Sequence, residues 1–248
     1  MQVTVFGDAE ALAAGAASLV RERVRAKPNL VMAVPAGRTP RRMYALLEAL
    51  QVEDPVDFSR LRVFGVDELC PPAPVAGYFW QQVRREFLAW AGIPEERCHP
   101  FALAHADVNE MCRRYEKLIA ERGGLDLVML GLGPNAHLAS NEPGTPFDSV
   151  TRPVPLLPET VAYIRTDPTN LGLAGGAVSG QAVTLGLATI LAAREVIVLV
   201  SGAGKRAALA RMLDGPVTPD APASILQTHA CCTVLTDREA RGGRTPDI

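Results

Sequence analysis

Apolar and amphipathic runs alternate along the chain, and their lengths separate expected strands from expected helices. Short apolar or β-branched runs predict buried strands at residues 3–6, 30–34, 62–66, 125–131, 195–200 and 233–236. Longer amphipathic or alanine-rich runs predict helices at residues 8–26, 41–50, 76–91, 107–122, 184–193 and 205–213. This strand-then-helix order predicts an α/β fold, a mainly parallel sheet with helices on both faces.

The periodic pattern breaks down between residues 143 and 180. This stretch is rich in proline, glycine and threonine, so we expect mostly loops with short strands there. The chain shows no internal repeat and no low-complexity linker. Its 248 residues fit one large α/β unit, so we expect a single domain over residues 1–248.

Composition and charge narrow the classes of partner. Lys plus Arg number 25 and Asp plus Glu number 27, so the formal net charge of -2 provides no broad basic surface for nucleic acid. No apolar run reaches the roughly 18 residues that a membrane helix needs, and the first residues resemble a strand rather than a signal peptide. Five cysteines without a CxxC pair favour a reduced, cytoplasmic protein.

Four predicted strands end in chemically rich loops, which follow Val34, Val66, Leu130 and Val200. In a parallel sheet, ligands bind beyond the carboxyl ends of the strands. We therefore expect these four loops to meet at one edge of the sheet and to form the binding site.

The first and last of these loops have features of an anion site. Gly37, Arg38 and Thr39 precede a helix, whose first backbone N–H groups favour a phosphate. In the last loop, two glycines are followed by Lys205, a common phosphate ligand, although the spacing is not that of a P-loop. Both loops can also be tight turns, with Pro40 at the first helical position in one and a solvated lysine in the other.

Two adjacent acids, Asp67 and Glu68, stand at the end of the third strand. A carboxylate in this place could shuttle a proton between neighbouring carbons of a sugar. The alternative is that one of the two acids only caps the following turn.

The loop at residues 131–144 is the richest of the four. It places His137 close to Asn135, Asn141 and Glu142, among three glycines and two prolines. A histidine with a nearby carboxylate is an acid–base pair, because the carboxylate orients the ring and stabilises its charged form. No second histidine or cysteine has metal-ligand spacing here, so we expect no metal site.

Taken in order, these loops resemble the glucosamine-6-phosphate deaminase family, within a wider group that includes 6-phosphogluconolactonases. The resemblance covers about residues 3–237. It rests on Pro35-Ala-Gly-Arg-Thr-Pro40, Phe64-Gly-Val-Asp-Glu-Leu69, the 131–144 loop, and Ala182-Val-Thr-Leu-Gly-Leu187 with Ser201-Gly-Ala-Gly-Lys205. The Asn141-Glu-Pro-Gly144 ending and the Val66-Asp-Glu-Leu69 segment favour the deaminases over the lactonases.

The resemblance implies a Rossmann-like sheet, a sugar 6-phosphate ligand, and neither a metal nor an organic cofactor. It implies that Asp67 is the general base that moves a proton between carbons 1 and 2. It also implies that His137 assists ring opening and that Glu142 supports this histidine. The family's phosphate-loop positions match Gly37, Thr39 and Lys205. The implied reaction isomerises the amino sugar and releases ammonia, giving fructose 6-phosphate.

The chain departs from the family pattern at several positions. Asn135-Ala136-His137 replaces the family's Asp-Gly-His, and an asparagine can hydrogen-bond but cannot carry charge. Arg38 replaces a Gly or Ser, which either adds a charged phosphate donor or crowds the site. The family's middle-loop arginine has no secure counterpart, and Arg165 is the candidate.

We therefore expect a sugar-phosphate isomerase or deaminase, with an altered substrate as one variant because of Asn135. One alternative is a lactonase in which His137 activates water, and another is a non-catalytic sugar-phosphate-binding protein. The expected catalytic residues are Asp67, His137, Glu142 and Asn135. The expected substrate-binding residues are Gly37, Arg38, Thr39, Lys205, Glu68 and Asn141. The expected partner is a small phosphorylated sugar, without nucleic acid or membrane, and the sequence leaves open whether the chain forms a homo-oligomer.

Overall fold

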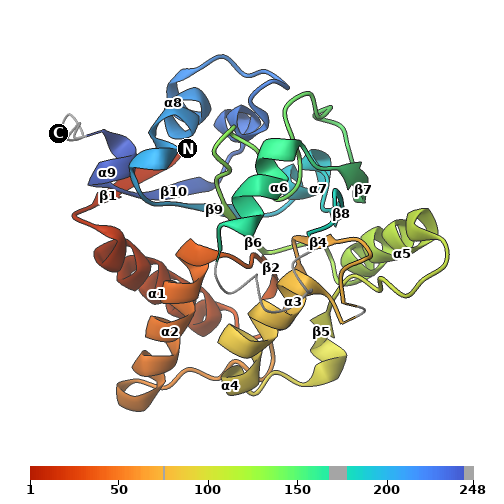
Figure 1. Cartoon of the computed structure of the whole chain (residues 1–248). Coiled ribbons are helices and arrows are strands. Elements are labelled where there is room, and N and C mark those ends of the chain that lie inside the picture. Colours follow the sequence, from red (N-terminus) through yellow and green to blue (C-terminus); the bar gives the residue numbers. More distant parts are fainter. Residues whose placement is uncertain (75, 168–177, 243–248) are drawn as a thin grey trace.

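The central feature of the structure is a sheet of seven parallel strands in the order β1-β10-β9-β6-β2-β3-β5 (Figure 1). This computed structural model describes residues 1–74, 76–167 and 178–242. The strands are β1 (Gln2–Phe6), β2 (Val31–Val34), β3 (Arg62–Gly65), β5 (Cys98–His99), β6 (Leu127–Gly131), β9 (Glu195–Val200) and β10 (Cys232–Asp237). The predicted α/β class with a mainly parallel sheet is confirmed.

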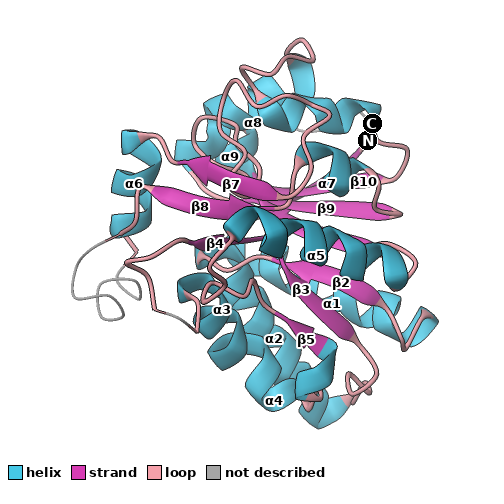
Figure 2. Cartoon of the chain, turned by 90° about the vertical axis from the view of Figure 1, so that its right-hand side faces the viewer, coloured by secondary structure: helices cyan, strands magenta, loops and turns pink. Residues whose placement is uncertain are grey.

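Helices cover both faces of this sheet, because successive strand residues point to opposite sides. In β2, Met32 and Val34 join a core with α1, α2 and α3, whereas Val31 and Ala33 join a core with α5, α7 and α8. Figure 2 shows α1, α2 and α3 on one side of the strands and α8 and α9 on the other. The helices are α1 (Ala9–Ala26), α2 (Arg38–Glu53), α3 (Tyr78–Val83), α4 (Ala89–Ala91), α5 (Val108–Glu121), α6 (Pro158–Arg165), α7 (Leu187–Leu191), α8 (Arg206–Asp214) and α9 (Arg238–Arg241).

One helix start follows its local sequence signal and another does not. Asp8 caps α1 by accepting a hydrogen bond from the backbone N–H of Ala11 at 2.8 Å, as its position predicts. Helix α2 begins at Arg38, three residues before the predicted start, so Pro40 is the third helical residue rather than the first. This is compatible with proline, because the first N–H groups of a helix have no intrahelical partner.

A second, three-stranded antiparallel sheet was not predicted. It has the order β4-β8-β7, with β4 (Asp67–Leu69), β7 (Arg152–Pro155) and β8 (Gln181–Thr184). The predicted helix at residues 184–193 is therefore partly wrong, because Thr184 ends β8 and the helix is confined to Leu187–Leu191. The short apolar segment β8 is extended because it pairs with two strands that are distant in sequence. Local periodicity does not reveal such pairing.

The stretch predicted as loops with short strands holds β7 but also helix α6, which was not predicted. Leu157 and Pro158 start this helix in the way that proline favours, at the first helical position. Residues 168–177, the middle of the same predicted stretch, lie outside the described residues.

Helices α3 and α4 form one helical run with a π-helical segment, η1 (Arg84–Leu88), between them. The start of this run is held by the buried carboxylate of Glu68, which is 1% exposed. Its Oε1 accepts hydrogen bonds from the N–H groups of Tyr78 and Phe79 at 2.8 and 2.9 Å, and its Oε2 accepts one from Trp80 at 2.8 Å. A fourth N–H, that of Leu69, also donates to Oε1, at 2.8 Å. Glu68 therefore ties β4 to the N-terminus of α3.

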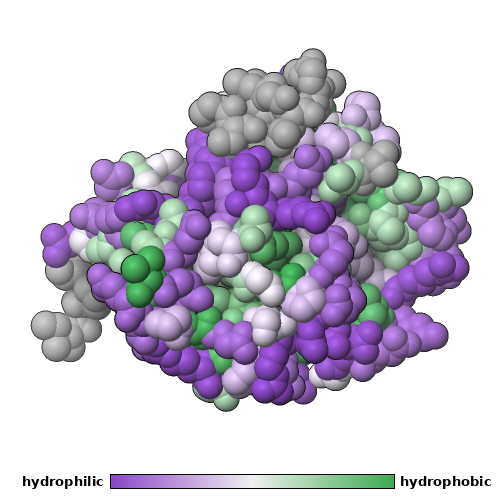
Figure 3. Space-filling view, turned by 90° about the horizontal axis from the view of Figure 1, so that it is seen from below, coloured by the Kyte–Doolittle hydropathy of each residue, from purple (hydrophilic) through white to green (hydrophobic). Residues whose placement is uncertain are grey.

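The face of the molecule below the sheet in Figure 1 is mainly polar. Figure 3 shows the face seen from below in Figure 1, where hydrophilic side chains predominate and hydrophobic ones show in smaller areas between them. The exposed large hydrophobic residues of the described segments are scattered along the chain, at Met1, Val52, Val150 and Val217. Within residues 1–74, 76–167 and 178–242, no helix is long and apolar enough to cross a bilayer.

The close approach of Gly77 to Glu68 gives a stability prediction. Gly77 has φ +81°, and a Cβ there would collide with Oε2 of Glu68, whereas Gly123 has φ +82° and open space. We expect Gly77→Ala to lower the free energy of unfolding by about 1–3 kcal/mol more than Gly123→Ala, because overpacking against Glu68 adds to the backbone strain of Gly77, whose φ of +81° and ψ of 149° are adopted almost only by glycine. Urea unfolding followed by circular dichroism measures both. Equal losses for the two variants would show that the Glu68 contact contributes nothing.

Candidate functional site

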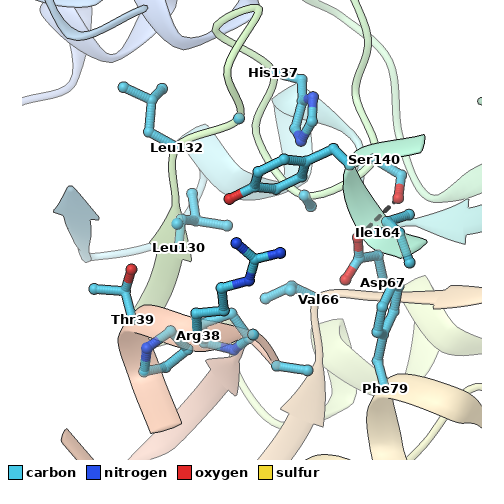
Figure 4. Close-up of a pocket in the computed structure, with 18 of the residues that line it drawn as sticks. Arg38, Thr39, Val66, Asp67, Phe79, Leu130, Leu132, His137, Ser140 and Ile164 are labelled. Carbon is cyan, nitrogen blue, oxygen red and sulfur yellow. Dashed lines mark hydrogen bonds between the residues drawn. The ribbon is translucent and has the colours of Figure 1, made fainter. Parts of the chain in front are cut away.

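A single pocket gathers the loops at the carboxyl ends of β2, β6 and β9, together with the start of β4 and one face of α6. Six of the ten predicted site residues line it: Gly37, Arg38, Thr39, Asp67, His137 and Lys205. Figure 4 shows Arg38 and Thr39 on one wall and His137 and Asp67 on others, with the side chains of Arg38 and His137 directed into the pocket. The convergence expected at one edge of the parallel sheet is therefore present.

One wall of the pocket is the N-terminus of α2, a 16-residue helix. Gly37 is its N-cap with φ +115°, a conformation that favours glycine. The N–H of Gly37 donates to Oε1 of Gln82 at 3.1 Å, so this predicted anion donor already has a protein acceptor. The N–H groups of the following residues, Arg38 and Thr39, belong to the first turn, which has no intrahelical acceptors and favours an anion.

Two cations approach the same aromatic ring beside this helix terminus. The ammonium of Lys205 lies 4.3 Å from the ring centroid of Tyr163, and the guanidinium carbon of Arg38 lies 5.3 Å from it. Both distances are within the range of cation–π attraction. Tyr163 on α6 therefore holds both positive charges at the pocket wall.

The guanidinium of Arg38 also contacts α6 and the residues after it. It donates to the hydroxyl of Thr166, and its Nε lies 3.7 Å from Oδ2 of Asp167. Arg41 binds the same Asp167 oxygen at 3.1 Å. Arg38 thus extends across the pocket mouth instead of filling its floor. Arg165, the sequence candidate for a middle-loop phosphate arginine, is exposed on α6 and does not line the pocket.

Asp67 lies on the pocket wall at the start of β4, and its side chain is partly exposed. Its Oδ2 accepts a hydrogen bond from the hydroxyl of Ser140 at 2.7 Å (Figure 4). Removal of the carboxyl group from water raises the pKa of Asp67 to about 7; the Ser140 hydrogen bond opposes this shift and the charge of Glu68 adds to it. A carboxyl group with a pKa near neutrality can both take and return a proton.

His137, Asn135 and Glu142 form a chain of hydrogen bonds. Oδ1 of Asn135 lies 2.7 Å from Nδ1 of His137, and Nδ2 of Asn135 donates to Oε2 of Glu142 at 2.9 Å. Burial alone would raise the pKa of Glu142, but interactions with His137 and Asn135 outweigh it and lower the pKa to about 2. Glu142 is therefore ionised and can only accept, which turns the Asn135 amide group toward it and leaves the amide oxygen for His137.

The orientation of the Asn135 amide fixes the histidine tautomer. Because the amide oxygen accepts, Nδ1 of His137 carries the proton of the neutral ring, and Nε2 keeps its lone pair. The ring rests on the backbone of Gly133, where a Cβ would collide with its Cδ2, Cε1 and Nε2 atoms. Nε2 is therefore the histidine nitrogen that remains for a ligand.

The backbone around His137 keeps the form that glycine favours although two alanines stand there. Ala136 has φ +69° and Ala139 has φ +50°, in the left-handed region that is costly for residues with a Cβ. The N–H of Ala136 donates to the Gly133 carbonyl at 3.0 Å, and its carbonyl accepts from Ala223 at 2.9 Å. The departure from glycine at residue 136 is therefore accommodated without loss of the turn. Strain of this kind is concentrated at functional sites.

Four predicted site residues lie outside the pocket lining. Asn135 and Glu142 act behind His137, as described above. Glu68 points away to the α3 N-terminus, where three N–H groups of α3 and that of Leu69 occupy its oxygens, so we assign it a structural role in place of substrate contact. Asn141 is 0% exposed and donates to the carbonyls of Leu138 and Leu185 at 3.0 and 2.8 Å, so it too closes the loop.

The pocket also has residues that sequence reasoning missed, namely Ser140, Tyr163, Gln82, Phe79 and Thr160. Ser140 sits inside the 131–144 loop, where a polar residue three positions after His137 is a usable signal. Tyr163 and Thr160 lie on the helix that was not predicted, and Gln82 and Phe79 lie on a helix whose facing partner is distant in sequence. Across the described segments, no group of three His, Cys, Asp or Glu side chains is placed to hold a metal ion.

Comparison with known sequences shows long matches. The family described as glucosamine-6-phosphate isomerases/6-phosphogluconolactonase matches residues 7–235. The glucosamine-6-phosphate deaminase of Shouchella clausii is 37% identical over 234 residues, covering 93% of this chain and 92% of that relative. The glucosamine-6-phosphate deaminase of Rhodopirellula baltica is 35% identical over 246 residues, covering 97% and 94%.

Solved structures agree with these matches. A monomeric glucosamine-6-phosphate deaminase has a TM-score of 0.91 at 30% identity, covering 98% of this chain and 100% of that chain. The 6-phosphogluconolactonase of Trypanosoma brucei has a TM-score of 0.75 at 23% identity, covering 98% of each chain, which is a likeness of fold. Together with the pocket, these matches show that the chain belongs to the glucosamine-6-phosphate isomerase/6-phosphogluconolactonase family.

Proposed function

We propose that this protein converts glucosamine 6-phosphate and water into fructose 6-phosphate and ammonia. The observation that carries the proposal is the pairing of Asp67 and His137 in one pocket whose other wall holds Lys205, Arg38 and the α2 N-terminus. An anion site opposite an acid–base pair suits a sugar with a phosphate at one end and reacting carbons at the other. The deaminases that match this chain over nearly its full length support the same substrate.

The phosphate would bind between the α2 N-terminus and Lys205. The first-turn N–H groups, the Thr39 hydroxyl and the Lys205 ammonium are donors of the kind that hold phosphate oxygens. The Arg38 guanidinium, at the mouth, would add a second positive charge. Fixing the phosphate in this way presents carbons 1 and 2 to the opposite wall, which supplies orientation before any chemical step.

Ring opening is the step for His137. Nε2 accepts the proton of the hydroxyl on carbon 1, the bond from carbon 1 to the ring oxygen breaks, and the imidazolium returns this proton to the ring oxygen. The imidazolium that forms is stabilised by Glu142, whose charge reaches the ring at 3.5 Å and through the Asn135 amide. The product of this step is the open-chain aldehyde.

Asp67 carries the proton between carbons. Its carboxylate takes the proton from carbon 2, a double bond forms between carbons 1 and 2, and the aldehyde oxygen takes a proton from the substrate's own ammonium group and becomes a hydroxyl. Asp67 returns the proton to carbon 1, which leaves an iminium at carbon 2. Water then adds, the carbon–nitrogen bond breaks, and ammonia leaves. A pKa of about 7 suits both transfers at neutral pH.

Replacing Asp67 tests both its role and its burial. We expect Asp67→Asn to reduce ammonia release by at least roughly 10²-fold, because the amide cannot take a proton. We also expect it to stabilise the fold at pH 8 by on the order of 2 kcal/mol, since the pKa of Asp67 is raised to about 7 and ionisation disfavours the folded state. This gain in stability should shrink as pH falls from 7 toward 4. Asp67 is then protonated in the folded protein, so its burial no longer removes a charge from water.

Coupled ammonia assays and urea unfolding at pH 5 and pH 8 measure these effects. Asp148→Asn, at an exposed aspartate outside the pocket lining, is the matched control and should change neither quantity. If the unmodified protein releases no ammonia and Asp67→Asn still hydrolyses 6-phosphogluconolactone, the function is lactone hydrolysis rather than deamination. Tight binding of the sugar without any turnover would instead indicate a sugar-phosphate-binding protein.

Replacing Lys205 tests the phosphate wall. We expect Lys205→Ala to raise KM for glucosamine 6-phosphate by roughly 10- to 100-fold, the size expected for loss of a hydrogen bond to a charged group. Initial-rate kinetics measure it. Lys117→Ala, whose side chain is 77% exposed on α5, is the control and should leave KM unchanged. An unchanged KM for Lys205→Ala would place the phosphate elsewhere.

Replacing Asn135 by aspartate tests the link to the histidine. A carboxylate beside Nδ1 favours the charged ring, so we expect His137 in Asn135→Asp to keep its added proton to higher pH than in the unmodified protein. Nuclear magnetic resonance titration of the imidazole signals measures this. Asn109→Asp, an exposed change on α5, serves as control. If both variants titrate like the unmodified protein, Asn135 does not control His137.

A further inference from the structure

Ser140 is the one neighbour whose side chain hydrogen-bonds to Asp67 within the described segments. Its hydroxyl donates to Oδ2 at 2.7 Å, Ser140 itself is 4% exposed, and both residues line the pocket. Oδ1 has no such donor among the described residues. The two oxygens of the proposed base are therefore unequal: one is bound by the protein and the other is available to the ligand (Figure 4).

The position of Ser140 is fixed by the second sheet. Thr184 is the residue opposite Asp67 in the β4–β8 pairing, and its hydroxyl accepts the backbone N–H of Ser140 at 3.1 Å. Ala139, with φ +50°, turns the chain immediately before Ser140. The same strand pairing that places Asp67 thus places its hydrogen-bond donor, and the serine side chain has little freedom to turn away.

The charged groups around Asp67 do not duplicate this contact. Glu68, the next residue on β4, adds a negative charge that disfavours ionisation of Asp67. The other charged or titratable side chains on the pocket wall come from α2, the 131–144 loop, α6 with the residues after it, and the β9–α8 connection. They are Arg38, His137, Tyr163, Asp167 and Lys205. None of these five forms a hydrogen bond or an ion pair with Asp67, whereas the Ser140 contact directly favours the carboxylate.

We propose that Ser140 is the positioning residue of the base: it binds Oδ2 of Asp67, so that Oδ1 takes the proton from carbon 2, and it sets the pH at which Asp67 begins to act. The inference rests on the proposed function for the identity of the transferred proton. The hydroxyl keeps its own proton throughout, because it stabilises the carboxylate and does not transfer charge. Without it, desolvation and Glu68 would keep Asp67 protonated over more of the neutral range.

The test is the pH profile of Ser140→Ala. We expect the rising limb of kcat/KM to move upward by about one pH unit, because a hydrogen bond to a charged group shifts its equilibrium by about tenfold. We expect turnover on the high-pH plateau to stay within several-fold of the original, since Asp67 remains in place. Ser140→Cys, which keeps a weaker donor of similar size, should give an intermediate shift. The cysteine variant also keeps the proposal testable if the alanine variant does not fold.

Ser59→Ala is the matched control. Ser59 sits beside Asp57 in an exposed Ser–Asp pair remote from the pocket lining, so its removal should leave the profile unchanged. A Ser140→Ala protein that is folded and has an unshifted rising limb would overturn the proposal. A plateau loss as large as that of Asp67→Asn would also overturn it, because Ser140 would then take part in the chemistry itself.

A second measurement separates this proposal from the proposed function. The carboxyl carbon of Asp67, identified by comparison with Asp67→Asn, can be titrated by nuclear magnetic resonance in the resting protein without substrate. We expect its midpoint to move upward in Ser140→Ala by the same amount as the kinetic limb. A protein that releases no ammonia would refute the proposed function, and the carboxyl titration would still support or overturn the role of Ser140.

Discussion

The buried carboxylate of Glu68 is the interaction on which the arrangement of the site depends. Four backbone N–H groups hold it in place, and it joins the start of the second sheet to the first turn of α3. Because neighbouring residues of a strand point to opposite sides, locking Glu68 on one side directs Asp67 to the other, toward the pocket. The two adjacent acids therefore differ: backbone N–H groups occupy both oxygens of Glu68, whereas one oxygen of Asp67 has no hydrogen-bond donor among the described residues.

Local sequence patterns predict most of the central sheet and half of the site. Strands β2, β6 and β9 are short apolar runs, and the carboxyl ends of parallel strands lie at one edge of the sheet. The sequence alone therefore places the loops with Thr39, His137 and Lys205 together. The second sheet was missed because β4, β7 and β8 are each at most four residues long and gain their form from pairing with segments that are distant in sequence, as Asp67 pairs with Thr184 and Arg152 with Thr184.

The pocket residues that the sequence did not predict also depend on contacts between segments that are distant in sequence. Tyr163 reaches the site only because α6 crosses it, and Ser140 matters only because the β4–β8 pairing brings Asp67 beside it. By contrast, Asn135 beside His137 was visible in the sequence, and its role required geometry. Its amide links the Glu142 carboxylate to the imidazole with both polar atoms used, so it transmits orientation without adding charge.

The ring of Tyr163 has a consequence for the two cations of the pocket wall. Lys205 and Arg38 both lie within cation–π distance of it, so part of their positive charge is already stabilised by the protein. An anion that draws either cation toward itself must offset the loss of that contact. In the proposed phosphate site, this cost is smaller relative to the gain for a doubly charged phosphate than for a monovalent anion.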